Sequence, residues 1–223
     1  MNRKLLAVFL IMILVQGACS LGSINPNSVV GSGKVASEIR SVSGFSSVAL
    51  QGSGNVDVTL GDTESVIIEA DDNILPLIET NVLAGQLIIS TKGYTTINPI
   101  TPVRVNVTMK TLKGLTLSGS GNIHVAKMAG DSLMVNLPGS GNITVTGSVT
   151  NVDASLSGSG NIYCSGLQAK SATVTLNGSG EVEVFASQSL NAGVLGSGTI
   201  RYGGNPSQIS KSISGSGSIN PLN

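Results

Sequence analysis

The stretch LSGSGNIHV, residues 117–125, decides the fold, because its pattern returns three more times along the chain. It reappears as LPGSGNITV at 137–145, LSGSGNIYC at 156–164 and LNGSGEVEV at 176–184. Gly-Ser-Gly triplets begin at residues 31, 52, 119, 139, 158, 178, 196 and 215. From 119 onward the steps between triplets are 20, 19, 20, 18 and 19 residues. A period near twenty residues is typical of repeat architectures.

Apolar and polar residues alternate on both sides of each triplet. In one copy Val152, Ala154 and Leu156 precede the triplet, and Ile162 and Cys164 follow it. Alternation with a period of two predicts strands with one buried face. Glycine tolerates positive φ, so we expect the triplet to bend the backbone between two strands.

The repeat predicts an all-β fold, namely a parallel β-helix (solenoid), right-handed or a close relative, with about 19–20 residues per coil. At roughly 3.3 Å per strand residue, about twenty residues close a small three-sided coil, and successive coils lie about 4.8 Å apart. The strands of outer-membrane barrels need about 9–11 residues, whereas the alternation here lasts for about five residues before a glycine corner, which excludes that class. An antiparallel sandwich remains an alternative. Between 57 and 117 the strands are separated by longer, polar turns, which predicts larger irregular coils or a strand-rich cap.

The residue after the triplet predicts a ladder of side chains. Asn122, Asn142 and Asn161 occupy this position in three consecutive coils, so their amides would hydrogen-bond to one another along the stack. Glu181 replaces asparagine in the next coil, and we expect the ladder to end there.

The N-terminus has the pattern of an export signal. Arg3 and Lys4 precede an apolar run, which predicts a signal peptide over residues 1–18. VQGAC resembles a lipobox with Cys19 as the lipidated residue, although Gln16 stands where leucine is usual. The alternative is ordinary cleavage near Ala18, which leaves no anchor.

These features predict the following organisation. Residues 19–39 would form an N-terminal lipoprotein segment and linker, and residues 40–223 a single β-helix domain. Ser20 after the cysteine favours an exported outer-membrane lipoprotein, facing the periplasm or the cell surface.

Composition narrows the range of partners. Twelve basic and twelve acidic residues give a formal net charge of zero. Nucleic acids and anionic membranes are bound by clustered cations, so we expect no nucleic-acid partner and membrane contact only through the lipid anchor. The second cysteine, Cys164, occupies a valine position of the repeat and is expected to be a small buried hydrophobe.

We find no constellation in the sequence that predicts catalysis, a cofactor or a metal site. The single histidine, His124, is expected on the solvent side of a strand without a nucleophile beside it. Glu181 and Glu183 share one strand and would point outward together. The acidic turns at 61–64 and 70–73 are expected to be solvated rather than to bind calcium. GSGK at 31–34 lacks the phosphate-loop spacing and is interpreted as one more corner.

Aromatic residues are too few to predict a sugar-binding platform. In the mature chain they are Phe45, Tyr94, Tyr163, Phe185 and Tyr202. Tyr163 should face outward and Tyr202 inward, so these two do not lie together.

Several motifs resemble one bacterial family. They are GSGNV at 52, VIIEADDNILPLIETNV at 66–82, LIIST at 87 and PVRVNVTMKTLKGLTLSGSGNI at 102–123, followed by the later GSGNI repeats. Their order resembles the putative auto-transporter adhesin, head GIN domain family, over residues 40–220. The resemblance implies a β-helical bacterial surface or lipoprotein-type protein and brings no catalytic residues.

The sequence therefore favours a surface lipoprotein that serves as an adhesin or envelope binding module without catalytic activity. Its expected partner is a cell-surface glycan or an envelope protein, and oligomer formation through exposed strand edges is left open. The alternative is a polysaccharide-active β-helix lyase or hydrolase, which would need two or three carboxylates from adjacent coils in one groove.

Overall fold

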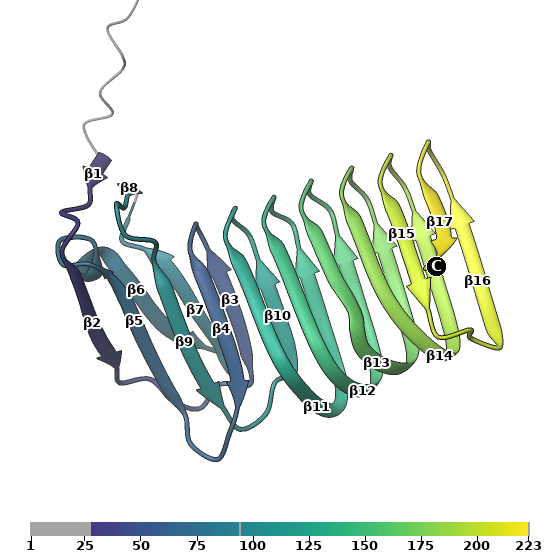
Figure 1. Cartoon of the computed structure of the whole chain (residues 1–223), viewed down its shortest axis with the longest axis horizontal. Helices are drawn as coiled ribbons and strands as arrows, with labels where there is room; N and C mark the ends of the chain where they lie inside the picture. The colour runs from purple at the N-terminus through teal and green to yellow at the C-terminus, as the bar shows by residue number, and fades with distance from the viewer. Residues whose placement is uncertain (1–27, 94, 223) are drawn as a thin grey trace, which may run out of the picture.

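The computed structural model describes residues 28–93 and 95–222, which form a β-solenoid of about five turns with irregular N-terminal strands (Figure 1). The signal peptide and Cys19 lie outside the described residues. Among the residues described, the helical content is the single 3₁₀ turn η1 (Leu75–Leu77). No helix in this part of the chain is long and apolar enough to cross a membrane.

Long bent strands build the regular part of the solenoid. Each begins after a triplet in one sheet, bends, and ends before the next triplet in the opposite sheet (Figure 1). Neighbouring strands in this part are parallel. The long bent strands are β11 (Asn122–Leu137), β12 (Asn142–Leu156), β13 (Asn161–Leu176) and β14 (Glu181–Val194). The short strand β10 (Gly114–Leu117) precedes them, and the short strands β15 (Thr199–Gly203), β16 (Gln208–Ile213) and β17 (Ser218–Pro221) follow them.

Equivalent residues of successive coils lie directly beside one another. Ile123 pairs with Ile143, and Ile143 with Ile162. The column continues to Val56 on one side and to Val182 on the other. All five are buried, so the alternating residues of the repeat form one continuous aliphatic core. The predicted parallel solenoid is confirmed.

The triplets form the corners, but for a reason other than the predicted one. A Cβ added to Gly139 would lie 2.2 Å from the carbonyl oxygen of Gly119, and one added to Gly141 would lie 1.9 Å from that of Gly121. Neither Gly139 nor Gly141 has a positive φ. Glycine is needed here because the backbones of stacked corners touch, not because the corner requires left-handed backbone. The corner glycines with positive φ are Gly52, Gly54 and Gly215.

The first coil is separated in sequence from the coil that it touches. β3 (Ser47–Gln51) and β4 (Asn55–Leu60) flank the triplet at 52 and pair in parallel with β10 and β11. Residues 61–113 are therefore inserted between two neighbouring coils of the stack.

The inserted residues close the N-terminal end of the core. β7 (Gln86–Thr91) and β9 (Arg104–Met109) add one more parallel layer on β3 and β4. The next strands reverse direction: β6 (Ile78–Leu83) runs antiparallel to β7, β5 (Ser65–Asp71) to β9, and β2 (Val35–Arg40) to β5. We call residues 28–40 and 61–109 the cap, since β3 and β4 between them belong to the first coil. The cap combines both predicted alternatives, an irregular coil and a strand-rich covering.

The segment expected to be a linker contains ordered strands. β1 (Ser28–Val30) pairs with β8 (Thr96–Asn98) in a separate two-stranded sheet, and β2 belongs to the main sheet. The triplet at 31 is not a corner, because it joins β1 to β2 outside the stack. Local repeats could not reveal these pairings, since the partners lie far away in the sequence.

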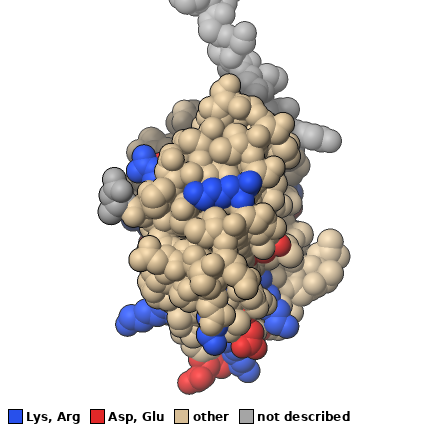
Figure 2. Space-filling view, turned by 90° about the vertical axis from the view of Figure 1, so that its right-hand side faces the viewer, with Lys and Arg blue, Asp and Glu red and all other residues tan. Residues whose placement is uncertain are grey.

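The C-terminal end of the core lacks such a covering in the described residues. Ile209, Lys211 and Ile213 of β16 pair with buried positions of β14, yet Ile209 is 47% exposed and Ile213 50%. The ammonium of Lys211 donates to the Tyr202 hydroxyl at 2.9 Å and lies 4.4 Å from the centroid of that ring. It also lies 3.4 Å from the Ile219 carbonyl oxygen. Figure 2 shows this end, where basic side chains lie across a largely uncharged surface.

Candidate functional site

The asparagine ladder uses its hydrogen-bonding groups within the protein. The Nδ2 of Asn142 donates to Oδ1 of Asn122 at 2.9 Å, and the Nδ2 of Asn161 donates to Oδ1 of Asn142 at 2.9 Å. Asn122 extends the ladder to Asn55 of the first coil, at 2.8 Å. The backbone N–H of Glu181 donates to Oδ1 of Asn161, so the ladder of amides ends at Glu181. These contacts link successive coils through one N–H donor and the Oδ1 atom of each inner amide.

The carboxylates on the neighbouring strands are paired rather than convergent. Glu181 forms an ion pair with Nε of Arg201 at 2.8 Å, and Glu183 accepts a hydrogen bond from Oγ of Ser165 at 2.9 Å. His124 is exposed on the outer face of β11. Within residues 28–93 and 95–222, no three His, Cys, Asp or Glu side chains are placed to share a metal ion.

Cys164 is a core residue. It is fully buried in the aliphatic column that contains Val184, its partner on β14. Burial raises the pKa of its thiol to about 12, so the reactive thiolate is scarce at neutral pH.

Asp71 is a buried residue whose carboxylate connects three segments of the cap by hydrogen bonds. Its carboxylate accepts backbone N–H bonds from Ile100 at 2.8 Å, Gly33 at 3.1 Å and Thr101 at 3.2 Å. Burial acts to raise the pKa of Asp71, but the hydrogen bonds from Thr101, Ile100 and Gly33 outweigh it and hold the pKa below its usual value. A Cβ on Gly31 would lie 1.9 Å from this carboxylate. The GSGK segment therefore wraps a carboxylate of the protein itself.

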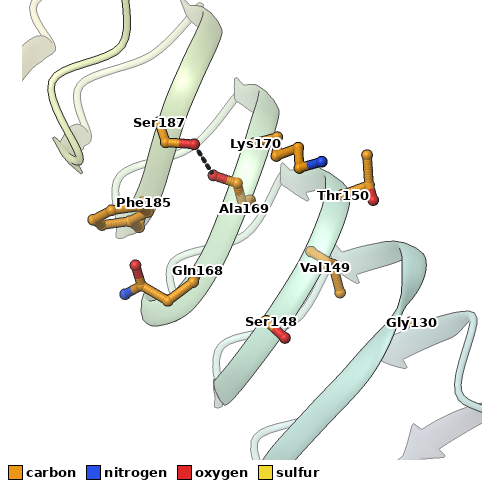
Figure 3. A pocket seen from close by; sticks show the side chains of 9 residues that line it. All are labelled: Gly130, Ser148, Val149, Thr150, Gln168, Ala169, Lys170, Phe185 and Ser187. Atoms are coloured by element: carbon orange, nitrogen blue, oxygen red, sulfur yellow. Dashed lines mark hydrogen bonds between the residues drawn. The ribbon is translucent and has the colours of Figure 1, made fainter.

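A groove of about 450 Å³ (Figure 3) lies where the long strands bend, at the edge of the solenoid opposite the glycine corners (Figure 1). It crosses β11, β12, β13 and β14. Buried or small residues form its floor, and hydroxyl, amide, ammonium and aromatic groups line it. The lining residues are Gly130, Ser148, Val149, Thr150, Gln168, Ala169, Lys170, Phe185 and Ser187. We call it the bend groove.

Unequal coils shape the bend groove. Cys164 and Gln168 are separated by three residues, whereas their partners Val184 and Phe185 are adjacent. β14 therefore turns this bend with a shorter path and brings an aromatic ring to the surface. The sequence analysis missed this feature, although the 18-residue step after the triplet at 178 marks the shortened coil.

Two further grooves lie on the outer face of the sheet that contains the second halves of the long strands. One, of about 390 Å³, is lined by residues that include Asp153, Lys113, Met134 and Asn151. The other, of about 410 Å³, is lined mainly by uncharged polar side chains such as Thr173 and Asn191. Neither brings together two carboxylates, the arrangement expected of a polysaccharide-cleaving enzyme.

The fold defines the protein as a β-solenoid with a capped N-terminal end. The family model described as putative auto-transporter adhesin, head GIN domain, matches residues 44–206, and the chain belongs to that family. Among curated proteins, none matches the chain.

Solved structures share this fold. A putative adhesin from Bacteroides fragilis is 24% identical, with a TM-score of 0.74, and the match covers 87% of this chain and 100% of that one. A putative lipid binding protein from Parabacteroides distasonis is 28% identical over 88% of this chain and 100% of its own, with a TM-score of 0.56. A putative adhesin from the same species is 26% identical, with a TM-score of 0.54, over 87% of this chain and all of its own.

Proposed function

We propose that the protein is an exported lipoprotein, anchored through Cys19 in the outer membrane, that binds a surface glycan or an envelope protein without catalysing a reaction. Family membership supports an adhesin-like role. The apolar run and the VQGAC sequence before the domain support export and lipid attachment.

One observation carries the binding role. The carboxylates of the last long strand pair with neighbours, Glu181 with Arg201 and Glu183 with Ser165, while the grooves along the sides are lined by polar groups. A regular stack of such grooves offers repeated weak contacts to a polymer or a cell surface. Lipid attachment would hold this surface at the membrane.

Metabolic labelling of cells with a palmitate analogue tests the anchor. The label should appear on the wild-type chain and disappear in Cys19→Ala, while Cys164→Ala, a matched control, should keep it. Label that persists in Cys19→Ala would contradict the anchor. Protease treatment of intact and permeabilised cells then determines which side of the outer membrane the domain faces.

A screen of polysaccharides with the purified chain tests the absence of catalysis. We expect no release of reducing ends or unsaturated sugars. Turnover that is abolished by Glu183→Gln would replace this proposal with the enzyme alternative.

A further inference from the structure

We infer that the bend groove is a binding site for an acidic sugar chain, with Phe185 stacking on a sugar ring and Lys170 pairing with a uronate carboxylate. The inference rests on the proposed binding function and deepens it by naming the site and the ligand chemistry.

The shape of the groove suits an extended chain. It crosses four neighbouring strands, which at about 4.8 Å per strand gives a length of about 14 Å along the solenoid axis. Its floor is closed by Val149 and Ala169, both buried, and Gly130 contributes no side chain there. A ligand can therefore lie along the groove without displacing a bulky residue.

Phe185 provides the apolar surface. The ring is half-buried and lies beside Gln168, its partner on β13 (Figure 3). The ring packs against the backbone of Gly203 and Gly204, which leaves no room for a side chain on Gly204, since a Cβ there would come 2.9 Å from its Cζ. An aromatic ring fixed next to an amide can cover the C–H face of a sugar while the amide hydrogen-bonds to its hydroxyl groups.

The polar groups of the groove are available for a ligand. The side chains of Ser148, Thr150, Gln168 and Lys170 make no hydrogen bond or ion pair within the described residues. The asparagine ladder and Glu181 differ, because their side chains pair with other side chains of the protein. Several open donors beside one aromatic ring match the hydroxyl-rich surface of a saccharide.

Charge selects the acidic sugar. Lys170 is the one charged residue among those that line the groove, and it extends from β13 toward Thr150 on β12 (Figure 3). The groove of about 390 Å³ on the sheet face differs, because the charge of Lys113 is offset there by the opposite charge of Asp153. A single ammonium group in a water-exposed groove favours a ligand that places one carboxylate beside it. A basic surface suited to an anionic membrane would need more cations than this.

Calorimetric titration with tetragalacturonate and its fully methyl-esterified form tests the inference. The chain is produced from residue 19 with Cys19→Ser, so that no lipid is attached. The wild type should bind the acid more tightly than the ester. Lys170→Gln should weaken binding of the acid by about tenfold, the value of one charge-assisted hydrogen bond, and remove the preference for the acid.

Phe185→Ala should weaken binding of both forms, because the stacking surface is lost. Phe185→Leu retains apolar bulk against Gly204 and replaces the alanine variant if thermal unfolding shows that the latter is not folded. Lys110→Gln and Tyr163→Ala, exposed or half-exposed positions away from the groove, should bind as the wild type does.

Three results would overturn the inference. They are no binding of tetragalacturonate by the wild type, binding by Lys170→Gln and Phe185→Leu that is as tight as that of the wild type, and equal affinity of the wild type for the acid and the ester. Binding to phosphatidylglycerol vesicles in place of the sugar, weakened by Lys170→Gln, would assign the groove to lipid instead. The palmitate-labelling result does not depend on this ligand, so a failed titration with an intact anchor rejects the sugar site alone.

Discussion

In the regular coils the residues outside the bends lie on their equivalents in the coil before, whereas in the cap β2, β5 and β6 run antiparallel to their neighbours and no such equivalents exist. The coils are stabilised by repetition, through stacked glycines, an asparagine ladder and aliphatic columns. The cap is stabilised by individual contacts, of which the buried Asp71 carboxylate is the clearest. Damage to a coil should therefore affect the whole stack, and damage to the cap should remain local.

Replacing Gly141 with valine should have the largest effect. The new Cβ would lie 1.9 Å from the Gly121 carbonyl oxygen, and backbone stacked on backbone cannot move aside without shifting a coil. We expect a loss of about 4 kcal/mol or more in unfolding free energy, or roughly 8–16 °C in melting temperature.

Gly193→Ala is the matched control, because nothing lies within 4 Å of a Cβ at that position and its φ is not positive. It should unfold at nearly the wild-type temperature. A Gly141→Val variant as stable as Gly193→Ala would contradict the close packing of the corners.

Removing the Asp71 charge should loosen the cap and spare the coils. In Asp71→Asn the amide NH₂ group would face backbone N–H donors that now bind a carboxylate. Hydrogen exchange should accelerate in β1, β2 and β8 and stay unchanged in β12 and β13. Equal acceleration in β12 would show that cap and coils unfold as one unit.

The pH dependence of the cap follows from the same group. The pKa of Asp71 is lowered in the folded chain, so the charged form favours folding. This stabilisation is complete above the ordinary aspartate pKa of about 3.9 and is lost as the pH falls through the lower folded value. Protection factors in the cap, which are corrected for the pH dependence of intrinsic exchange, should fall in acid in the wild type and depend less on pH in Asp71→Asn.

Breaking the ladder should cost less than breaking a corner. Asn142→Ala removes one hydrogen bond to Asn122 and one from Asn161, worth about 1–2 kcal/mol in total. Asn177→Ala, an exposed asparagine outside the ladder, should be neutral in the same thermal melts. If the two variants unfold alike, the ladder does not stabilise the stack.

Replacing Lys211 should change association more than stability. Its ammonium covers Tyr202 at the open end of the core, and a charge at an inward position of an edge strand opposes pairing with another chain. Lys211→Leu should form concentration-dependent oligomers in light scattering, and its unfolding free energy should change by about 1 kcal/mol or less. Lys110→Leu should remain in the wild-type state; oligomers in both variants would attribute the association to surface leucine alone.

The coils could be predicted from sequence because each coil repeats its neighbour, so burial of Leu133, Val152 and Ala172 follows from one local pattern. The cap could not, since β2 meets β5 through pairs such as Ala36 with Ala70 that no repeat encodes. The requirement for glycine was recognised and its cause was not, because contact between stacked corners is a property of the assembled fold. The sequence predicts no sugar-binding platform because aromatic residues are few, and the place of Phe185 in a groove, which no local pattern shows, follows from the shortened bend of β14.

The solenoid has two long edges, the glycine corners and the bends, and their sequences are constrained to different degrees. Along one edge the exposed serines of the triplets, such as Ser140 and Ser159, are the side chains displayed between glycines that admit no atom beyond hydrogen. Along the other edge the bends differ in length and sequence from coil to coil. Diversification of recognition among relatives should therefore accumulate at the bends, while the opposite ridge stays chemically uniform whatever each relative binds.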